Sequence, residues 1–97
     1  MSQDRHSAQP TVMIDNDRTR VTEWRFAPGA ETGHHRHEYD YVVVPIMTGS
    51  LRIIAPDGSE SVSELRHGAP YFRPAGVEHN VINAGTADFA FIEVEFK

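Results

Sequence analysis

Three histidines lie within four positions of the sequence, at His34, His35 and His37. His35 and His37 are two residues apart, and on a β-strand this spacing places both side chains on one face, with their Cα atoms roughly 6.5–7 Å apart. His34 then points to the opposite face. Imidazole is the commonest metal ligand among side chains. The spacing therefore predicts that His35 and His37 are two ligands of a metal site.

A third ligand is available further along the chain, where His79 opens the segment HNVIN directly after the turn-forming stretch PAGVE. We expect His79 to converge with His35 and His37 on one divalent transition metal. Iron, nickel and zinc are the ions that we favour, because imidazole binds all three. Three neutral imidazoles leave the ion its +2 charge and open coordination positions. The expected partner is therefore a small anionic metabolite.

The elements that must position these histidines are β-strands. Short runs rich in β-branched and aromatic residues are separated by turn signals, and no stretch shows helical periodicity. Pro45 predicts an edge, a bulge or a break, since proline cannot donate to a strand ladder. The pattern predicts an all-β sandwich or barrel, with one domain over 11–97 after a flexible lead-in at 1–10. The predicted strands are 11–14, 20–26, 39–47, the hairpin arms 51–55 and 61–65, 71–73, 79–83 and 89–96.

Composition narrows the function classes. The chain has 97 residues, a net charge of −5 and no cysteine. The acidic balance argues against nucleic acid as a partner. The lack of cysteine excludes disulfides and thiolate metal sites, and it is typical of a cytoplasmic protein. No apolar run reaches the ~18 residues that a membrane-spanning helix needs, so we expect no membrane partner.

The glycines, prolines and histidines together resemble the two signature motifs of the cupin family, G-x5-H-x-H-x3–4-E-x6-G and G-x5-P-x-G-x2-H-x3-N. The second motif is matched at Gly68, Pro74, Gly76, His79 and Asn83. The first is matched at Gly29, His35, His37 and Gly49. The segment HRHEYDYVVVP is further similar to a group of small bacterial cupins, some of them named β-alanine-degradation proteins. The resemblance implies a small jelly-roll barrel of two antiparallel sheets, a metal site at the three histidines, and a homodimer.

The sequence departs from the family at its usual glutamate ligand. That glutamate falls at position 41 or 42, where this chain has Tyr41 and Val42. Glu38 and Asp40 have the opposite strand parity from the histidines, so either would need a bulge to reach the metal. We therefore expect a three-histidine site, with Glu38 or Asp40 as the alternative fourth ligand. Tyr41 is the nearest candidate for general acid or base catalysis, provided that the cation lowers its pKa.

Three functions fit these residues. The first is a metal-dependent enzyme of the dioxygenase, isomerase or lyase type, since some three-histidine cupins are iron dioxygenases. The second is a non-catalytic cupin that binds or senses a small molecule, with or without metal. The third is a protein scaffold with vestigial histidines. Arg25 or Arg73 could bind a substrate carboxylate if it faced inward, although a solvated surface arginine is the expectation for each.

Overall fold

The computed structural model describes residues 6–97, and this part of the chain forms nine β-strands. No helix in the described part could cross a membrane. The strands are β1 (Gln9–Asp15), β2 (Thr19–Phe26), β3 (His35–Arg36), β4 (Asp40–Pro45), β5 (Gly49–Ile54), β6 (Glu60–Leu65), β7 (Tyr71–Arg73), β8 (Glu78–Asn83) and β9 (Phe89–Phe96).

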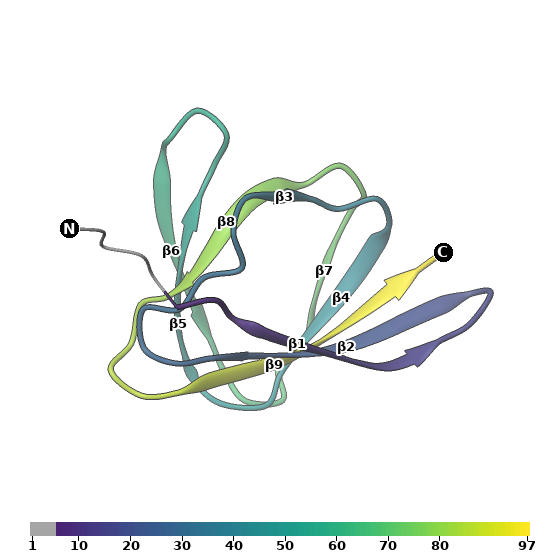
Figure 1. Ribbon diagram of the computed structural model, residues 1–97, viewed down its shortest axis with the longest axis horizontal. Helices are drawn as coiled ribbons and strands as arrows, with labels where there is room; N and C mark the ends of the chain where they lie inside the picture. The colour runs from purple at the N-terminus through teal and green to yellow at the C-terminus, as the bar shows by residue number, and fades with distance from the viewer. Residues whose placement is uncertain (1–5) are drawn as a thin grey trace.

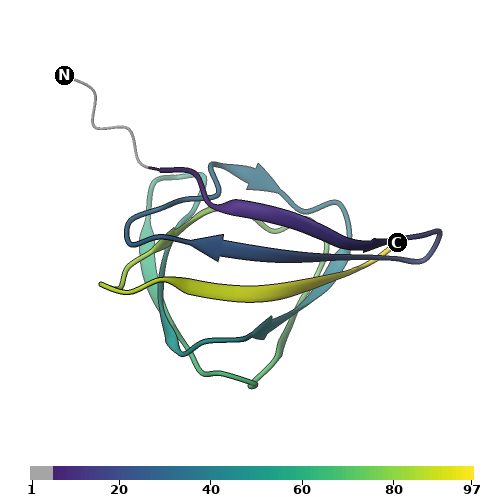
Figure 2. The ribbon, with the colours of Figure 1, turned by 60° about the horizontal axis from the view of Figure 1, so that its bottom comes forward.

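Two antiparallel sheets face each other (Figure 1). The first has five strands in the order β1-β2-β9-β4-β7, and the second has four in the order β3-β8-β5-β6. Figure 2 shows β1, β2 and β9 lying side by side across one face of the molecule. Successive strands alternate between the sheets at several points, as in a jelly roll. The expected small jelly-roll barrel is confirmed.

The predicted strand boundaries agree with the structure to within two residues, and those of β7 and β9 agree fully. β4 ends at Pro45, which confirms a strand break at that proline. One strand was not predicted, because β3 has only two residues. It contains His35, whereas His37 lies just beyond its end.

The start of the chain differs from the expected lead-in. β1 begins at Gln9, and Ala8 is buried with its N–H donating to the carbonyl of Glu31. This bond anchors the segment before β1 to the loop that precedes the histidines. Residues 1–5 of the expected lead-in lie outside the described residues.

The core lies between the two sheets. Phe26 on β2, Phe89 on β9 and Leu51 on β5 are almost fully buried. The alternation in β2 directs Thr22 and Phe26 inward, whereas Arg25 stays exposed and pairs with Glu23. These apolar side chains hold the two sheets together, and a cavity lined by both polar and apolar side chains lies between the sheets.

Candidate metal centre and ligand pocket

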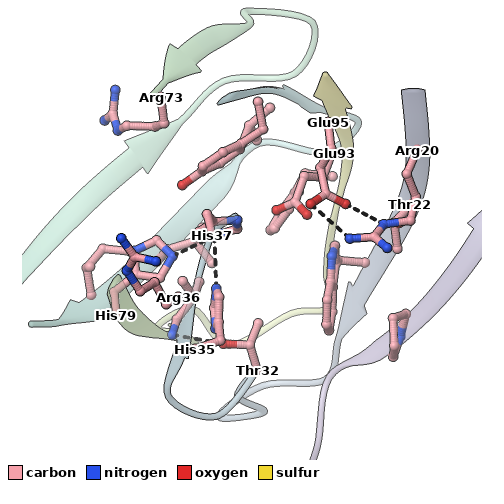
Figure 3. A pocket seen from close by; sticks show the side chains of 18 of the residues that line it. Arg20, Thr22, Thr32, His35, Arg36, His37, Arg73, His79, Glu93 and Glu95 are labelled. Atoms are coloured by element: carbon pink, nitrogen blue, oxygen red, sulfur yellow. Dashed lines mark hydrogen bonds and ion pairs between the residues drawn. The ribbon is translucent and has the colours of Figure 1, made fainter. Parts of the chain in front are cut away.

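A cavity of about 650 Å³ lies between the sheets and is lined by residues of both. The three predicted metal ligands lie together on one side of it, and two glutamates of β9 lie on the facing side (Figure 3). Its volume falls in the range of small-molecule binding sites. The fold therefore brings a candidate metal centre into a cavity large enough for a metabolite.

The three histidines converge through their Nε2 atoms. The distance from His37 Nε2 to His35 Nε2 is 3.0 Å, and the distance to His79 Nε2 is 3.2 Å. Two imidazole nitrogens bound to one metal at ~2.1 Å lie roughly 3.0–3.4 Å apart, for right-angled to tetrahedral coordination. The observed separations match those of a bound site. The donor set therefore fits a divalent transition metal.

The hydrogen bond of His35 sets which of its ring nitrogens is free. His35 Nδ1 lies 2.9 Å from the carbonyl oxygen of Gly33. A carbonyl oxygen can only accept, so Nδ1 carries the proton and Nε2 presents its lone pair to the centre. Orienting contacts of this kind are typical of metal-binding histidines. Asn80 holds the Gly33 segment in place by accepting a hydrogen bond from the N–H of Gly33.

Backbone pairing fixes the other two histidines. His79 is the register partner of His35 between β8 and β3. His37 donates its N–H to the carbonyl of Val77, and its own carbonyl accepts from Gly76. The PAGVE turn therefore holds His37 and His79 on either side of the same centre. Gly76 has a φ of +96°, a conformation that favours glycine, which explains its place in the motif.

Burial keeps two of the imidazoles neutral. Desolvation, assisted by His35, lowers the pKa of His37 to about 4. Desolvation likewise lowers the pKa of His79 to about 3, with a further contribution from His35 and His37. Only the neutral imidazole can bind a metal. In the absence of metal, His37 and His79 are therefore neutral throughout the physiological pH range.

Neither carboxylate considered as a fourth ligand belongs to this cluster. Asp40 Oδ1 accepts a hydrogen bond of 2.8 Å from the N–H of Ala75, which caps the turn before β8. Glu38 is exposed. Within residues 6–97, neither Asp40 nor Glu38 belongs to a group of side chains that could hold a metal together with the histidines. The opposite strand parity explains their positions.

The carboxylates that lie beside the histidines are Glu93 and Glu95, which sequence reasoning missed. Both are buried, and their oxygens lie within 4.8 Å of a ring nitrogen of His37 and of each other. They share the inward face of β9 with Phe89 and Phe91. The alternation in FAFIEVEF was the signal that could have revealed them, because it places two glutamates in line with two core phenylalanines.

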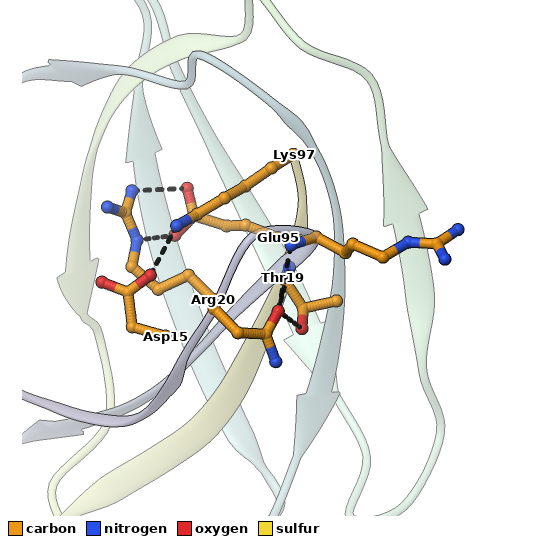
Figure 4. Close-up of polar contacts among 7 residues, drawn as sticks. Asp15, Thr19, Arg20, Glu95 and Lys97 are labelled. Carbon is orange, nitrogen blue, oxygen red and sulfur yellow. Dashed lines mark hydrogen bonds and ion pairs between the residues drawn. The ribbon is translucent and has the colours of Figure 1, made fainter.

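Strand register extends Glu95 into a row of polar side chains, which we call the polar row. Asp15, Arg20, Glu95, Tyr41 and Arg73 are register partners in that order across β1, β2, β9, β4 and β7. All five line the cavity. Within the row, Arg20 binds both oxygens of Glu95, at 2.7 and 3.2 Å (Figure 4). Asp15 is bound by Lys97. The charge of Glu95 is therefore neutralised inside the protein.

Glu93 occupies the next register position, between Thr22 and Val43, and its surroundings differ from those of Glu95. The indole N–H of Trp24 donates a hydrogen bond to it. Within residues 6–97, no cationic side chain forms an ion pair with it. Burial, followed by the nearby charge of Glu95, raises the pKa of Glu93 to about 7. Glu93 is thus a buried carboxyl group beside the histidines, and within residues 6–97 no cation is bonded to it.

Tyr41, the predicted acid or base, packs its ring against His37, with the ring centroids 3.9 Å apart. Burial, followed by the charge of Glu93, raises the pKa of its hydroxyl well above the usual value. In the metal-free protein the hydroxyl is therefore protonated at neutral pH and serves as a hydrogen-bond donor. Its role in catalysis stays a prediction.

The remaining candidates divide between the cavity and the surface. Arg73 lines the cavity with its guanidinium 4.6 Å from the centre of the Tyr71 ring. His34 points outward and contacts Glu78. The side chain of Asn83 is buried and bonds backbone groups near the end of β8.

The model of the Cupin domain family matches residues 22–95 of the chain. This chain is a cupin. The match includes all three histidines, Tyr41 and both cavity glutamates.

Two similar proteins cover the chain almost completely. The Beta-alanine degradation protein BauB of Pseudomonas aeruginosa is 56% identical over 93 residues, which are 96% of this chain and 97% of that protein. The crystal structure of a cupin domain from Bordetella pertussis is 55% identical, with a TM-score of 0.95 and 99% coverage of both chains.

A more distant structure shares the fold alone. The polyketide cyclase RemF of Streptomyces resistomycificus is 23% identical, with a TM-score of 0.71. The match covers 95% of this cupin and 68% of RemF. At this identity the likeness carries no argument about function.

Proposed function

We propose that this cupin is a metal-dependent enzyme of the dioxygenase, isomerase or lyase type that acts on a small anionic metabolite. His35, His37 and His79 hold one divalent transition metal, with iron, nickel or zinc as the favoured ions. The observation that carries the proposal is the convergence of three Nε2 atoms, one of them with its lone pair set by the bond from His35 to Gly33. Such a metal acts as a Lewis acid on the bound metabolite.

The residues around the metal have separate tasks in this proposal. The buried ring of Tyr41 holds His37 in place by stacking, and its protonated hydroxyl donates to the metabolite. The ion pair between Arg20 and Glu95 removes two charges from the cavity wall, so that the metal remains the attractive centre for an anion. The apolar side chains of Val43, Leu51 and Val81 exclude water from part of the cavity.

The experiment that tests this function is turnover by protein reconstituted with iron, nickel or zinc. The parent and His79→Ala are compared against a panel of small carboxylates, with oxygen uptake and product formation as readouts. The outward-facing His34 provides the matched control, His34→Ala. We expect turnover in the parent and in the control and its loss in His79→Ala. Equal behaviour of the parent and His79→Ala would contradict the proposal.

A non-catalytic binding function is the second candidate, and one observation favours it. The raised pKa of Tyr41 leaves the predicted acid or base protonated in the metal-free protein, so it cannot accept a proton there. This function predicts that a small acid raises the unfolding temperature without being consumed. Thermal unfolding of reconstituted protein, followed by recovery of the added acid, separates the two functions.

The biological setting is also part of the proposal. The name of the similar BauB protein places that protein in β-alanine degradation, and we propose a related context for this cupin. A cytoplasmic location rests on the cysteine-free sequence. We propose a homodimer because the edge strand β1 exposes apolar side chains that a second subunit would bury. At least half of the surface of Val12, Met13 and Ile14 is exposed. Sedimentation of the parent beside Met13→Lys measures that state.

A further inference from the structure

Glu93 stands out because a buried carboxylate without a cation is costly. Its exposed fraction is 8%, its hydrogen bond comes from the neutral indole of Trp24, and the nearby Arg20 is bound to Glu95. Burying a charge without a partner destabilises a protein by several kcal/mol. A carboxyl group under these conditions either takes up a proton, as the raised pKa of Glu93 indicates, or pairs with a cationic group that enters the cavity.

A second metal is not that partner. His37, Glu93 and Glu95 are close enough together to be considered as a metal site. However, both oxygens of Glu95 are bound by Arg20, and the Nε2 atom of His37 faces His35 and His79. Such a site would have only Glu93 free to bind. Of the two glutamates, Glu93 is therefore the one that is free to bind a group of the ligand.

We propose that Glu93 is the specificity-determining carboxylate of this pocket and that it binds a protonated amine on the ligand. The inference rests on the proposed function, in which the anionic end of the ligand binds the metal. The oxygen of Glu93 lies within 4.8 Å of a ring nitrogen of His37. A short molecule therefore reaches both positions with a spacer of a few atoms. The ligand class is a small amino acid whose amine and carboxylate are at opposite ends.

Binding to the zinc-loaded protein tests this proposal, because zinc has no redox chemistry to oxidise the ligand. Recovery of the added acid after the titration shows that no other reaction consumes it. Calorimetry compares 3-aminopropanoate with propanoate, and 4-aminobutanoate with butanoate. The parent is expected to bind at least one amino acid about ten-fold more tightly than its amine-free match, the gain typical of a charge-assisted hydrogen bond. Glu93→Gln is expected to lose this preference and to keep the affinity for the amine-free acid.

Two further variants make the result specific. Glu38→Gln removes an exposed carboxylate at the cavity wall and is expected to bind like the parent. Glu93→Asp keeps the charge and is expected to keep part of the amine preference, which guards against misfolding of Glu93→Gln as the cause. An equal affinity of the parent for both members of each pair would overturn the proposal, as would an unchanged preference in Glu93→Gln.

Zinc content, measured first, separates this proposal from the proposed function. A parent without zinc defeats the metal-dependent function and, with it, this inference. A parent with zinc but without an amine preference defeats only the inference. Loss of zinc in Glu93→Gln would make Glu93 a metal ligand and would also overturn it.

Discussion

The side chain of Glu93 gives the cavity a pH dependence of its own. Its pKa is raised to about 7 in the folded protein, from an ordinary value of 4.5. Between these two values the folded protein holds a proton that the unfolded chain releases. Stability from this group is therefore complete below about pH 4.5 and is lost as the pH rises through 7.

Replacement of Glu93 by glutamine isolates this effect in metal-free protein. Glutamine has nearly the same shape as glutamic acid but does not ionise. As the pH rises from 5 to 8, the parent should therefore lose stability relative to Glu93→Gln. The shift corresponds to a loss of about 2–3 kcal/mol. Urea unfolding at several pH values, with a chelator present, measures it. A difference that stays constant over this range would show that Glu93 is not a buried, unpaired acid.

At the residue level, the histidines could be predicted and the glutamates could not. His35, His37 and His79 stand at motif spacings that are local in the sequence. Glu93 and Glu95 alternate with core phenylalanines, but their position opposite His37 depends on β9 pairing between β2 and β4. That pairing joins segments far apart in the chain, and no local pattern specifies it.

At the element level, Asn83 joins the two sheets at the end of β8. Its Nδ2 atom donates to the carbonyls of Phe26, at the end of β2, and Ala87, in the turn before β9. Its Oδ1 atom accepts from the N–H of Gly85. The asparagine of the second motif is therefore structural, and it fixes the strand that carries His79.

Asn83→Ala should lower the free energy of unfolding by about 2–4 kcal/mol, because it leaves buried backbone groups without partners. Asn16→Ala is the matched control. The side chain of Asn16 likewise makes three hydrogen bonds, all accepted by its Oδ1 atom, but it lies in an exposed turn. Its loss should therefore cost less than about 1 kcal/mol. Chemical denaturation of the two variants makes the comparison. Equal losses would contradict the structural role of Asn83.

Gly49 shows a second constraint between elements, at the start of β5. A Cβ atom at this position would lie 2.6 Å from the ring of Phe89 on β9, and Phe89 is almost fully buried. The ring has no room to move, so the glycine of the first motif permits close approach of the two sheets.

Gly49→Ala should therefore destabilise the fold by about 2–3 kcal/mol through overpacking. Gly85→Ala serves as the control, since its nearest contact would be 3.4 Å, from Asn83 Oδ1. Its cost should stay below about 1 kcal/mol. Thermal unfolding of both variants tests this, and a Gly49→Ala variant as stable as the parent would show that the sheets can separate at no cost.

At the scale of the whole molecule, the fold class followed from short strands and turn signals, whereas the strand order did not. The sequence separates β2 from β9 and β4 from β9 by long stretches, and only the folded chain shows that they are neighbours. The result is a cavity with the three imidazoles on one wall and the polar row on the other. A metal that ties β3, the segment after it and β8 together would bind only the folded state and so stabilise it.

The central claim is that His35, His37 and His79 form one metal site. The most direct measurement is the metal content of tag-free protein after reconstitution, for the parent, the double variant His35→Ala/His37→Ala and the control His34→Ala. We expect about one equivalent in the parent and in the control and none in the double variant, with a rise in unfolding temperature only where metal is retained. Equal metal content in the parent and the double variant, whether one equivalent or none, would contradict the claim.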